Sequence, residues 1–122
     1  MSPTRLSPLR LTLAFGALAL LVTPLAAQSQ REIKYRERVT LNVGESVVVY
    51  GYRGDCGQLP TSGQVELPQL KTGTLSTGKD GIRMSKRCNG MTPAVEVIFT
   101  ATTPGRESFE LQGDGISVRV RN

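Results

Sequence analysis

The sequence contains no histidine, no tryptophan and only two cysteines among its 122 residues. Without an imidazole, Ser-His and Cys-His nucleophilic catalysis are excluded. Two cysteines cannot complete a tetrahedral zinc site without carboxylates. No Gly-rich phosphate loop with a following lysine occurs, and none of the ten acidic residues stands in a pattern that singles out a hydrolytic pair. We therefore predict a protein that is not an enzyme and that uses no cofactor and no metal.

The N-terminus lacks both acidic residues and an apolar run long enough to span a membrane. Arg5 and Arg10 come first, an apolar stretch (LTLAFGALALLV) fills residues 11–22, and Ala26 and Ala27 precede a polar segment. A spanning helix needs about 20 apolar residues, so this order predicts a secretory signal peptide over residues 1–27, cleaved near Ala27. We expect a periplasmic or secreted protein with no stable membrane anchor.

The exported part carries little excess charge. Residues 28–122 keep 13 of the 15 basic residues and all ten acids, which leaves a net charge of +3. A dedicated nucleic-acid binder clusters Lys and Arg more heavily, so nucleic acid is not an expected partner. The length predicts one domain over residues 36–122, after a polar segment at 28–35 that forms a flexible tail or a short edge strand.

Cys56 and Cys88 both lie in the exported part. Paired thiols become disulfides in oxidising compartments, and two cysteines allow a single intramolecular pairing. The sequence therefore predicts a Cys56–Cys88 bridge that closes a long loop.

Short strands are expected along most of the mature chain. Alternating apolar residues predict a strand at 36–43, with Val39, Leu41 and Val43 inward. The stretch SVVVYGY at 46–52 predicts a central strand buried on both sides. Residues 64–70 contain Pro68, which restricts them to an edge strand or an extended loop.

The second half of the chain repeats the pattern. We expect a strand at 72–76, a turn at 77–81 that uses Asp80-Gly81, and a strand at 82–88. In the last of these, Ile82, Met84 and Cys88 should share the inner face, with Arg83, Ser85 and Arg87 outside. Later strands place further apolar side chains inward: Val95, Val97, Phe99, Ala101, Ile116, Val118 and Val120.

With turn signals about every ten residues and no helical pattern, the sequence predicts an all-β fold. The expected form is a β-sandwich of seven to eight antiparallel strands, and a small β-barrel is the alternative.

Two stretches of the chain resemble known extracellular modules. Residues 95–120 (VEVIFTATTPGRESFELQGDGISVRV) and 39–49 (VTLNVGESVVV) are similar to the last and first strands of bacterial extracellular immunoglobulin-like modules. The resemblance covers about half of the mature chain. It implies an immunoglobulin-like sandwich and no particular activity, because such folds host many functions.

The candidate binding residues gather around the expected bridge. Lys79, Arg83, Lys86 and Arg87 lie within nine residues, and the bridge should bring Arg53 close to Arg87. This basic patch could attract an acidic polysaccharide, a phosphate or an acidic protein surface, or it could only solvate an outer face. Asp55 belongs to Arg53-Gly54-Asp55, which we interpret as a tight turn rather than an adhesion motif.

The function expected from the sequence is that of an exported binding module of immunoglobulin-like type. Its partner would be an envelope protein or an acidic polysaccharide, bound through loops or the basic patch. The alternative is a periplasmic inhibitor of a secreted hydrolase that inserts the disulfide-braced loop 54–63 into a cleft. A subunit that polymerises by strand exchange ranks last, because the N-terminal segment lacks the alternating large apolar residues of a donor strand.

Overall fold

The computed structural model of the protein describes residues 30–122, so the expected signal peptide lies outside the described residues. Within that range the chain is all β and has no helix, as the sequence predicts. Its six strands are β1 (Arg38–Asn42), β2 (Ser46–Arg53), β3 (Gly73–Ser85), β4 (Gly90–Ala101), β5 (Gly105–Leu111) and β6 (Asp114–Arg121). No helix among these residues is long and apolar enough to cross a bilayer.

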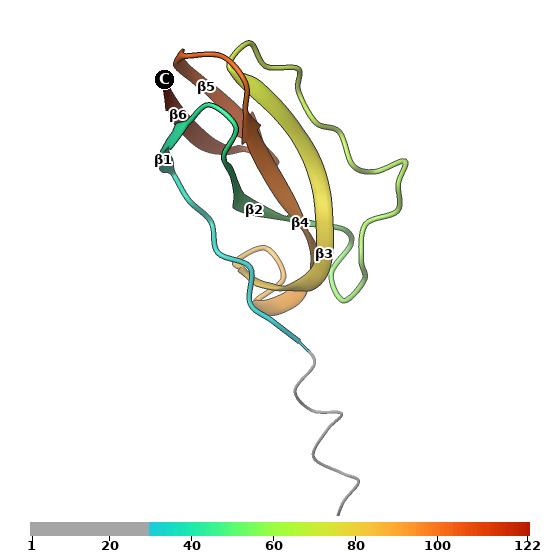
Figure 1. Ribbon diagram of the computed structural model, residues 1–122. Helices are drawn as coiled ribbons and strands as arrows, with labels where there is room; N and C mark the ends of the chain where they lie inside the picture. Colours follow the sequence, from blue (N-terminus) through green and yellow to red (C-terminus); the bar gives the residue numbers. More distant parts are fainter. Residues whose placement is uncertain (1–29) are drawn as a thin grey trace, which may run out of the picture.

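The strands form two sheets of three (Figure 1), in the orders β1-β6-β5 and β2-β4-β3. The described strands are therefore six rather than the expected seven to eight. They are also not all antiparallel, because β1 runs parallel to β6. The two sheets are separate and do not close into a barrel.

One apolar cluster joins the inner faces of both sheets. From β4 it takes Val97, Phe99 and Ala101, and from β6 it takes Ile116, Val118 and Val120, as the alternation predicts. Val39 and Leu41 of β1 pack against the cluster as expected. Val43 does not, because β1 ends at Asn42 and the chain turns at Gly44, whose φ is 95°. Val43 is 43% exposed.

The expected turn at residues 77–81 is wrong. β3 runs through it as one strand of 13 residues and pairs with β4 on both sides of a register shift between Thr77 and Asp80. Thr77, Asp80 and Gly81 pair with β4, and the N–H of Lys79 in the bulge donates to the Glu96 carboxylate. Gly81 is needed for close approach instead, since a Cβ there would lie 2.6 Å from the carbonyl oxygen of Arg31. The hairpin turn comes later, at Asn89, where φ is 58°.

The faces of β3 after the bulge also differ from those expected. Met84 was expected inside but is 57% exposed, and Ser85 was expected outside but is 2% exposed. The Ser85 Oγ accepts from the Cys88 N–H in the turn that follows β3, so the serine lies under that turn and Met84 faces outward. The periodicity of 82–88 therefore predicts the wrong face at its end, and β3 ends at Ser85.

β2 is buried on both sides, although it lies at the edge of its sheet and not at the centre. The segment 31–36 covers it. The backbone N–H of Arg36 donates to the carbonyl of Val49 (2.9 Å), and that of Ile33 donates to Ile82 on β3 (2.7 Å). Ile33 is 6% exposed, so this part of the expected flexible tail is docked between two strands. Residues 64–70 form no strand and adopt the extended-loop alternative.

Tyr50 occupies the centre of the core at 0% exposure. Its hydroxyl donates to Asp114 Oδ2 (2.6 Å), and the Arg83 guanidinium lies 5.1 Å from its ring centroid. Burial, followed by the hydrogen bond to Asp114, raises the pKa of Tyr50 from 10.0 to about 12. The Tyr50 phenol therefore stays protonated in the folded protein at a pH where the same phenol in the unfolded chain has begun to ionise.

A raised pKa of this kind should make the protein sensitive to alkali. Between pH 9 and 11 the unfolded chain loses a proton that the folded state keeps, so the free energy of unfolding should fall by about 1 kcal/mol as the pH rises. Urea denaturation at pH 9 and pH 11 measures the fall. Tyr50→Phe should reduce it, and an identical fall in both proteins would contradict the assignment.

Candidate functional site

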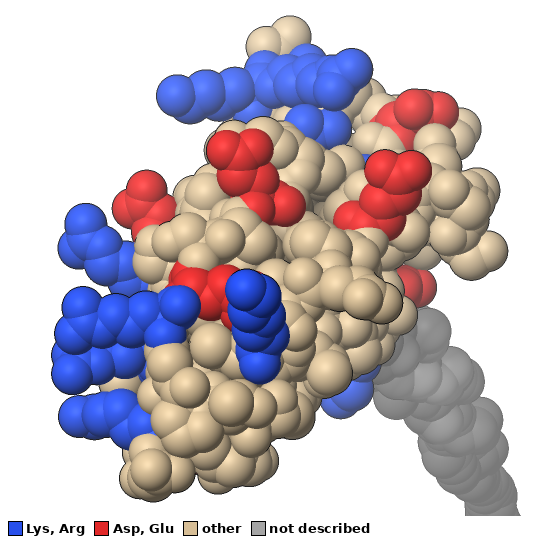
Figure 2. Space-filling view, turned by 90° about the horizontal axis from the view of Figure 1, so that it is seen from above, with Lys and Arg blue, Asp and Glu red and all other residues tan. Residues whose placement is uncertain are grey.

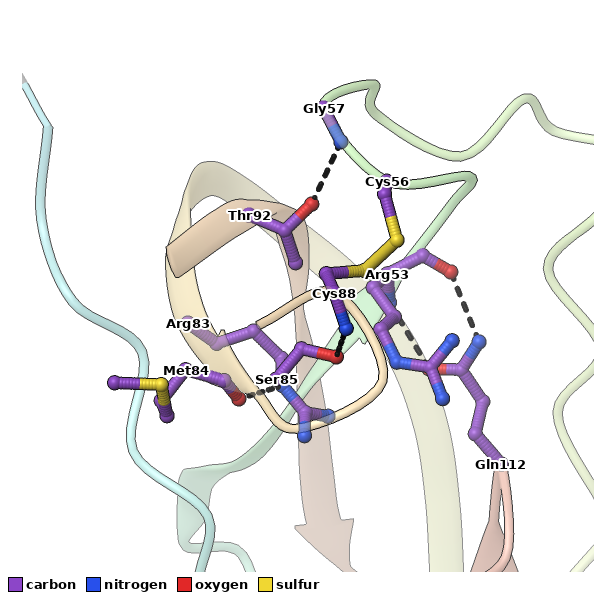
Figure 3. Close-up of a disulfide and its surroundings, with 9 residues drawn as sticks. All are labelled: Arg53, Cys56, Gly57, Arg83, Met84, Ser85, Cys88, Thr92 and Gln112. Carbon is purple, nitrogen blue, oxygen red and sulfur yellow. Dashed lines mark hydrogen bonds between the residues drawn. A yellow bond between two sulfur atoms is a disulfide. The ribbon is translucent and has the colours of Figure 1, made fainter. Parts of the chain in front are cut away.

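The predicted disulfide is present. Cys56 follows β2, Cys88 lies in the turn after β3, and their Cα atoms are 5.5 Å apart (Figure 3). The Cys88 N–H donates to Ser85 Oγ (3.3 Å), and the Gly57 N–H donates to Thr92 Oγ1 (2.9 Å). Both sides of the bridge are thus held to the β3–β4 hairpin. A disulfide indicates an oxidising, extracytoplasmic environment.

The Arg53-Gly54-Asp55 tripeptide is held in place by its surroundings. Gln112 binds the backbone of Arg53 twice, accepting from its N–H (3.0 Å) and donating to its carbonyl (2.9 Å) (Figure 3). A Cβ on Gly54 would lie 2.7 Å from the backbone nitrogen of Pro60, so only glycine fits. The carbonyl of Asp55 then accepts from the Gln58 N–H (2.9 Å) and forms a turn.

A polar hollow of about 420 Å³ opens beside the bridge. Its charged lining consists of two cations, Arg53 and Arg87, and two carboxylates, Asp55 and Glu66. The Nε of Arg53 is buried and has no hydrogen-bond partner among residues 30–122. Buried donors are almost always paired in folded proteins, so this unpaired N–H is an unusual feature of the pocket wall, and an acceptor would reach it only after a small movement of the side chains around it. We call this feature the disulfide pocket.

The loop that forms one wall of the disulfide pocket, residues 54–72, is tied down along its length although it contains no strand. In its middle, the Tyr52 hydroxyl donates to the Gln64 carbonyl (3.1 Å) and accepts from the Glu66 N–H (3.2 Å). At its far end, the Glu107 carboxylate accepts from the N–H groups of Lys71 and Thr72. The wall is therefore ordered before any ligand arrives, which reduces the entropy cost of binding.

Two carboxylates with lowered pKa, those of Glu96 and Glu107, stabilise the fold through their hydrogen bonds. Glu96 is 8% exposed and accepts from the Lys79 N–H (2.9 Å) and from Arg31 (2.8 Å), and these bonds lower its pKa. Burial alone would raise the pKa of Glu107, but its hydrogen bonds to Thr72 and Lys71 lower it. Both contributions to stability are present above the ordinary glutamate pKa and are lost as the pH falls.

The basic residues expected to form one patch do not share a face. Arg83 donates to the backbone carbonyls of Gly51 (3.1 Å) and Met84 (2.9 Å), so its guanidinium is used within the fold. Lys79 lies at the bulge of β3. Lys86 and Arg87 follow the end of β3, so the face that Arg83 and Arg87 were expected to share does not exist. Arg53 and Arg87 are the expected pair that the structure brings to one pocket.

Sequence reasoning missed Gln112 and Glu66. Gln112 is the first residue of the β5–β6 turn, with φ of 50°, and Glu66 lies in the loop wall. Both reach the disulfide pocket from segments whose position depends on the packing of the two sheets. Among residues 30–122, no group of three or more His, Cys, Asp and Glu side chains could hold a metal ion.

Compared with family models, with curated proteins and with solved structures, the chain has no significant match. The resemblance to immunoglobulin-like modules therefore stays a sequence-based prediction, and the site is interpreted from its own geometry.

Proposed function

We propose that the protein is an exported binding module of immunoglobulin-like type that recognises an acidic group of a partner protein in the disulfide pocket. The observation that supports this most strongly is the buried, unpaired Nε of Arg53 in a pocket that also holds Arg87. A guanidinium matches a carboxylate in shape and charge and can bind it through two parallel hydrogen bonds.

The mixed lining favours a protein over an acidic polysaccharide at this site. Asp55 and Glu66 line the same hollow as the two arginines and would repel the closely spaced negative charges of an acidic polymer. A peptide segment can present one carboxylate to Arg53 and a backbone or side-chain donor to Glu66. Matching charges of both signs across a contact gives specificity.

Selection from a random peptide phage library tests the proposal. The wild-type protein should enrich peptides that contain Asp or Glu. Arg53→Gln combined with Arg87→Gln should weaken binding of a selected peptide by about tenfold, as the loss of about 1.4 kcal/mol implies. Lys34→Gln combined with Lys86→Gln is the matched control, because it removes the same charge at exposed residues outside the pocket.

Two results would contradict this proposal: no enrichment of acidic peptides, or enrichment that survives the two arginine substitutions. The second result would instead favour an inhibitor that inserts loop 54–63 into a hydrolase cleft. Leu59 is the observation that supports this alternative, since it is 41% exposed in a loop held by the disulfide. Loss of binding on Leu59→Asp alone would identify that mode.

A further inference from the structure

A second charged surface covers the outer face of the sheet β1-β6-β5. The exposed positions of these strands carry four arginines, Arg38, Arg106, Arg119 and Arg121. We call this surface the arginine face. Figure 2 shows several Lys and Arg side chains on the left side of the molecule, with acidic side chains beside them, and Figure 1 places β1 and β6 on that side.

The arginines are set against one another and not against carboxylates. Arg106 lies directly opposite Arg119 in the β5–β6 ladder, and Thr40 lies beside Arg119 on the other side. Among residues 30–122 the one ion pair joins Arg31 and Glu96, away from this face. The nearest acid on the same face of β5, Glu110, lies opposite Gly115 at the other end of the strand. Like charges directly opposite each other destabilise a sheet, and a bound anion would relieve that repulsion.

Between the arginines the other exposed positions carry small polar groups. Ser108 and Ser117 lie opposite each other with their hydroxyl oxygens 3.1 Å apart, and Arg38 pairs with Ser117 from the other side. Together with Thr40 and the three arginines Arg38, Arg106 and Arg119 they line a shallow hollow of about 540 Å³. One carboxylate, Glu107, also lines it, and its oxygens already accept from Lys71 and Thr72. Guanidinium groups bind carboxylates, and hydroxyls can exchange hydrogen bonds with the hydroxyls of a sugar.

We propose that the arginine face binds an acidic polysaccharide, with Arg106 and Arg119 at the centre of the contact. Single-stranded nucleic acid is disfavoured because the outward positions of these strands offer no aromatic ring on which bases could stack. A membrane surface is disfavoured because these positions offer no large apolar side chain to enter the lipid. This inference does not depend on the proposed function, since the disulfide pocket uses other residues.

Titration calorimetry with polygalacturonate oligomers at low and high salt tests the proposal. Wild-type protein should bind, and its affinity should fall as salt is added. Arg106→Gln combined with Arg119→Gln should weaken binding at low salt by about tenfold. Lys34→Gln combined with Lys86→Gln, which removes the same charge elsewhere, should change it less than about twofold. The arginine variant should also fold, with Tm unchanged or up to about 4 °C higher, because a repulsive pair is removed.

Three results would overturn the proposal. The wild-type protein could fail to bind the oligomers at low salt. The two double variants could lose affinity equally, which would show a response to net charge alone. A single-stranded DNA oligomer or phosphatidylglycerol vesicles could bind more tightly than the polysaccharide, with the same dependence on Arg106 and Arg119, which would assign the face to another class of partner.

Discussion

Replacing Cys56 and Cys88 with serine should lower the free energy of unfolding by about 3 to 4 kcal/mol. The bridge joins residues 32 positions apart in the sequence, so removing it restores the conformational freedom of a long loop in the unfolded chain. The loss is a large fraction of the ~5 to 15 kcal/mol that stabilises a typical domain. Urea denaturation of the purified protein measures it.

The matched control is the wild-type protein in reductant, which should unfold at the same urea concentration as the double-serine variant. Binding should weaken as well, because Cys56 lines the disulfide pocket and the bridge fixes the spacing of Arg53 and Arg87. A variant that unfolds within about 1 kcal/mol of wild type would show that the hydrogen bonds of Gly57 and Gln112 already hold this end of the fold.

Phe99→Ala should lower the free energy of unfolding by about 3 to 5 kcal/mol. Phe99 is 0% exposed and lies on the central strand β4, between Val47 of β2 and Leu75 of β3. Its ring also closes over Gly73, where a Cβ would lie 2.6 Å from the ring edge. Truncation removes the side chain from the centre of the apolar cluster that joins the two sheets, and it leaves a cavity that the surrounding strands cannot fill.

Phe99→Leu is the control for Phe99→Ala. It keeps most of the volume and should cost less than about 1.5 kcal/mol. Thermal or urea denaturation of the three proteins gives the comparison. A cost below 1 kcal/mol for the alanine variant would be inconsistent with a shared core between the sheets.

The sequence predicts much of the fold where one face of a strand is buried and the other is wet. Ile116, Val118 and Val120 alternate with Arg119 and Arg121 in β6, and the period of two places each of them correctly. The same rule fails at the end of β3, where the apolar Met84 is exposed and the polar Ser85 is buried beneath the disulfide turn. The dipeptide Asp80-Gly81 is typical of a turn, yet it lies within β3. Glycine is required at position 81 because a Cβ there would clash with the backbone carbonyl of Arg31.

The sequence predicts less of the site. The disulfide could be predicted from the number of cysteines. The prediction that it brings Arg53 close to Arg87 agrees with the structure, in which both residues line the disulfide pocket. Gln112 and Glu66 could not be foreseen, because their approach depends on how two sheets and a strandless loop pack. The arginine face was missed for a related reason. Its residues come from β1, β5 and β6, and only the parallel pairing of β1 with β6 makes them neighbours.

The two proposals place different partners on different parts of the molecule. The disulfide pocket has two arginines and two carboxylates and suits a protein segment, whereas the hollow of the arginine face has three arginines and one carboxylate and suits a polymer of negative charge. Variants at Arg53 and at Arg106 should therefore impair different interactions, and each can be examined while the other remains intact.

The NMR signal of the Arg53 Nε–H group is the most direct test of the central claim, that this guanidinium receives a carboxylate of a partner protein. A ¹⁵N-labelled sample titrated with an acidic peptide from the phage selection should show a saturable shift of that signal and of the Gln112 side-chain amide. The same peptide with Asp and Glu replaced by Asn and Gln should shift neither. If the Arg53 signal stays in place while the arginines of β5 and β6 respond, the disulfide pocket is not the binding site.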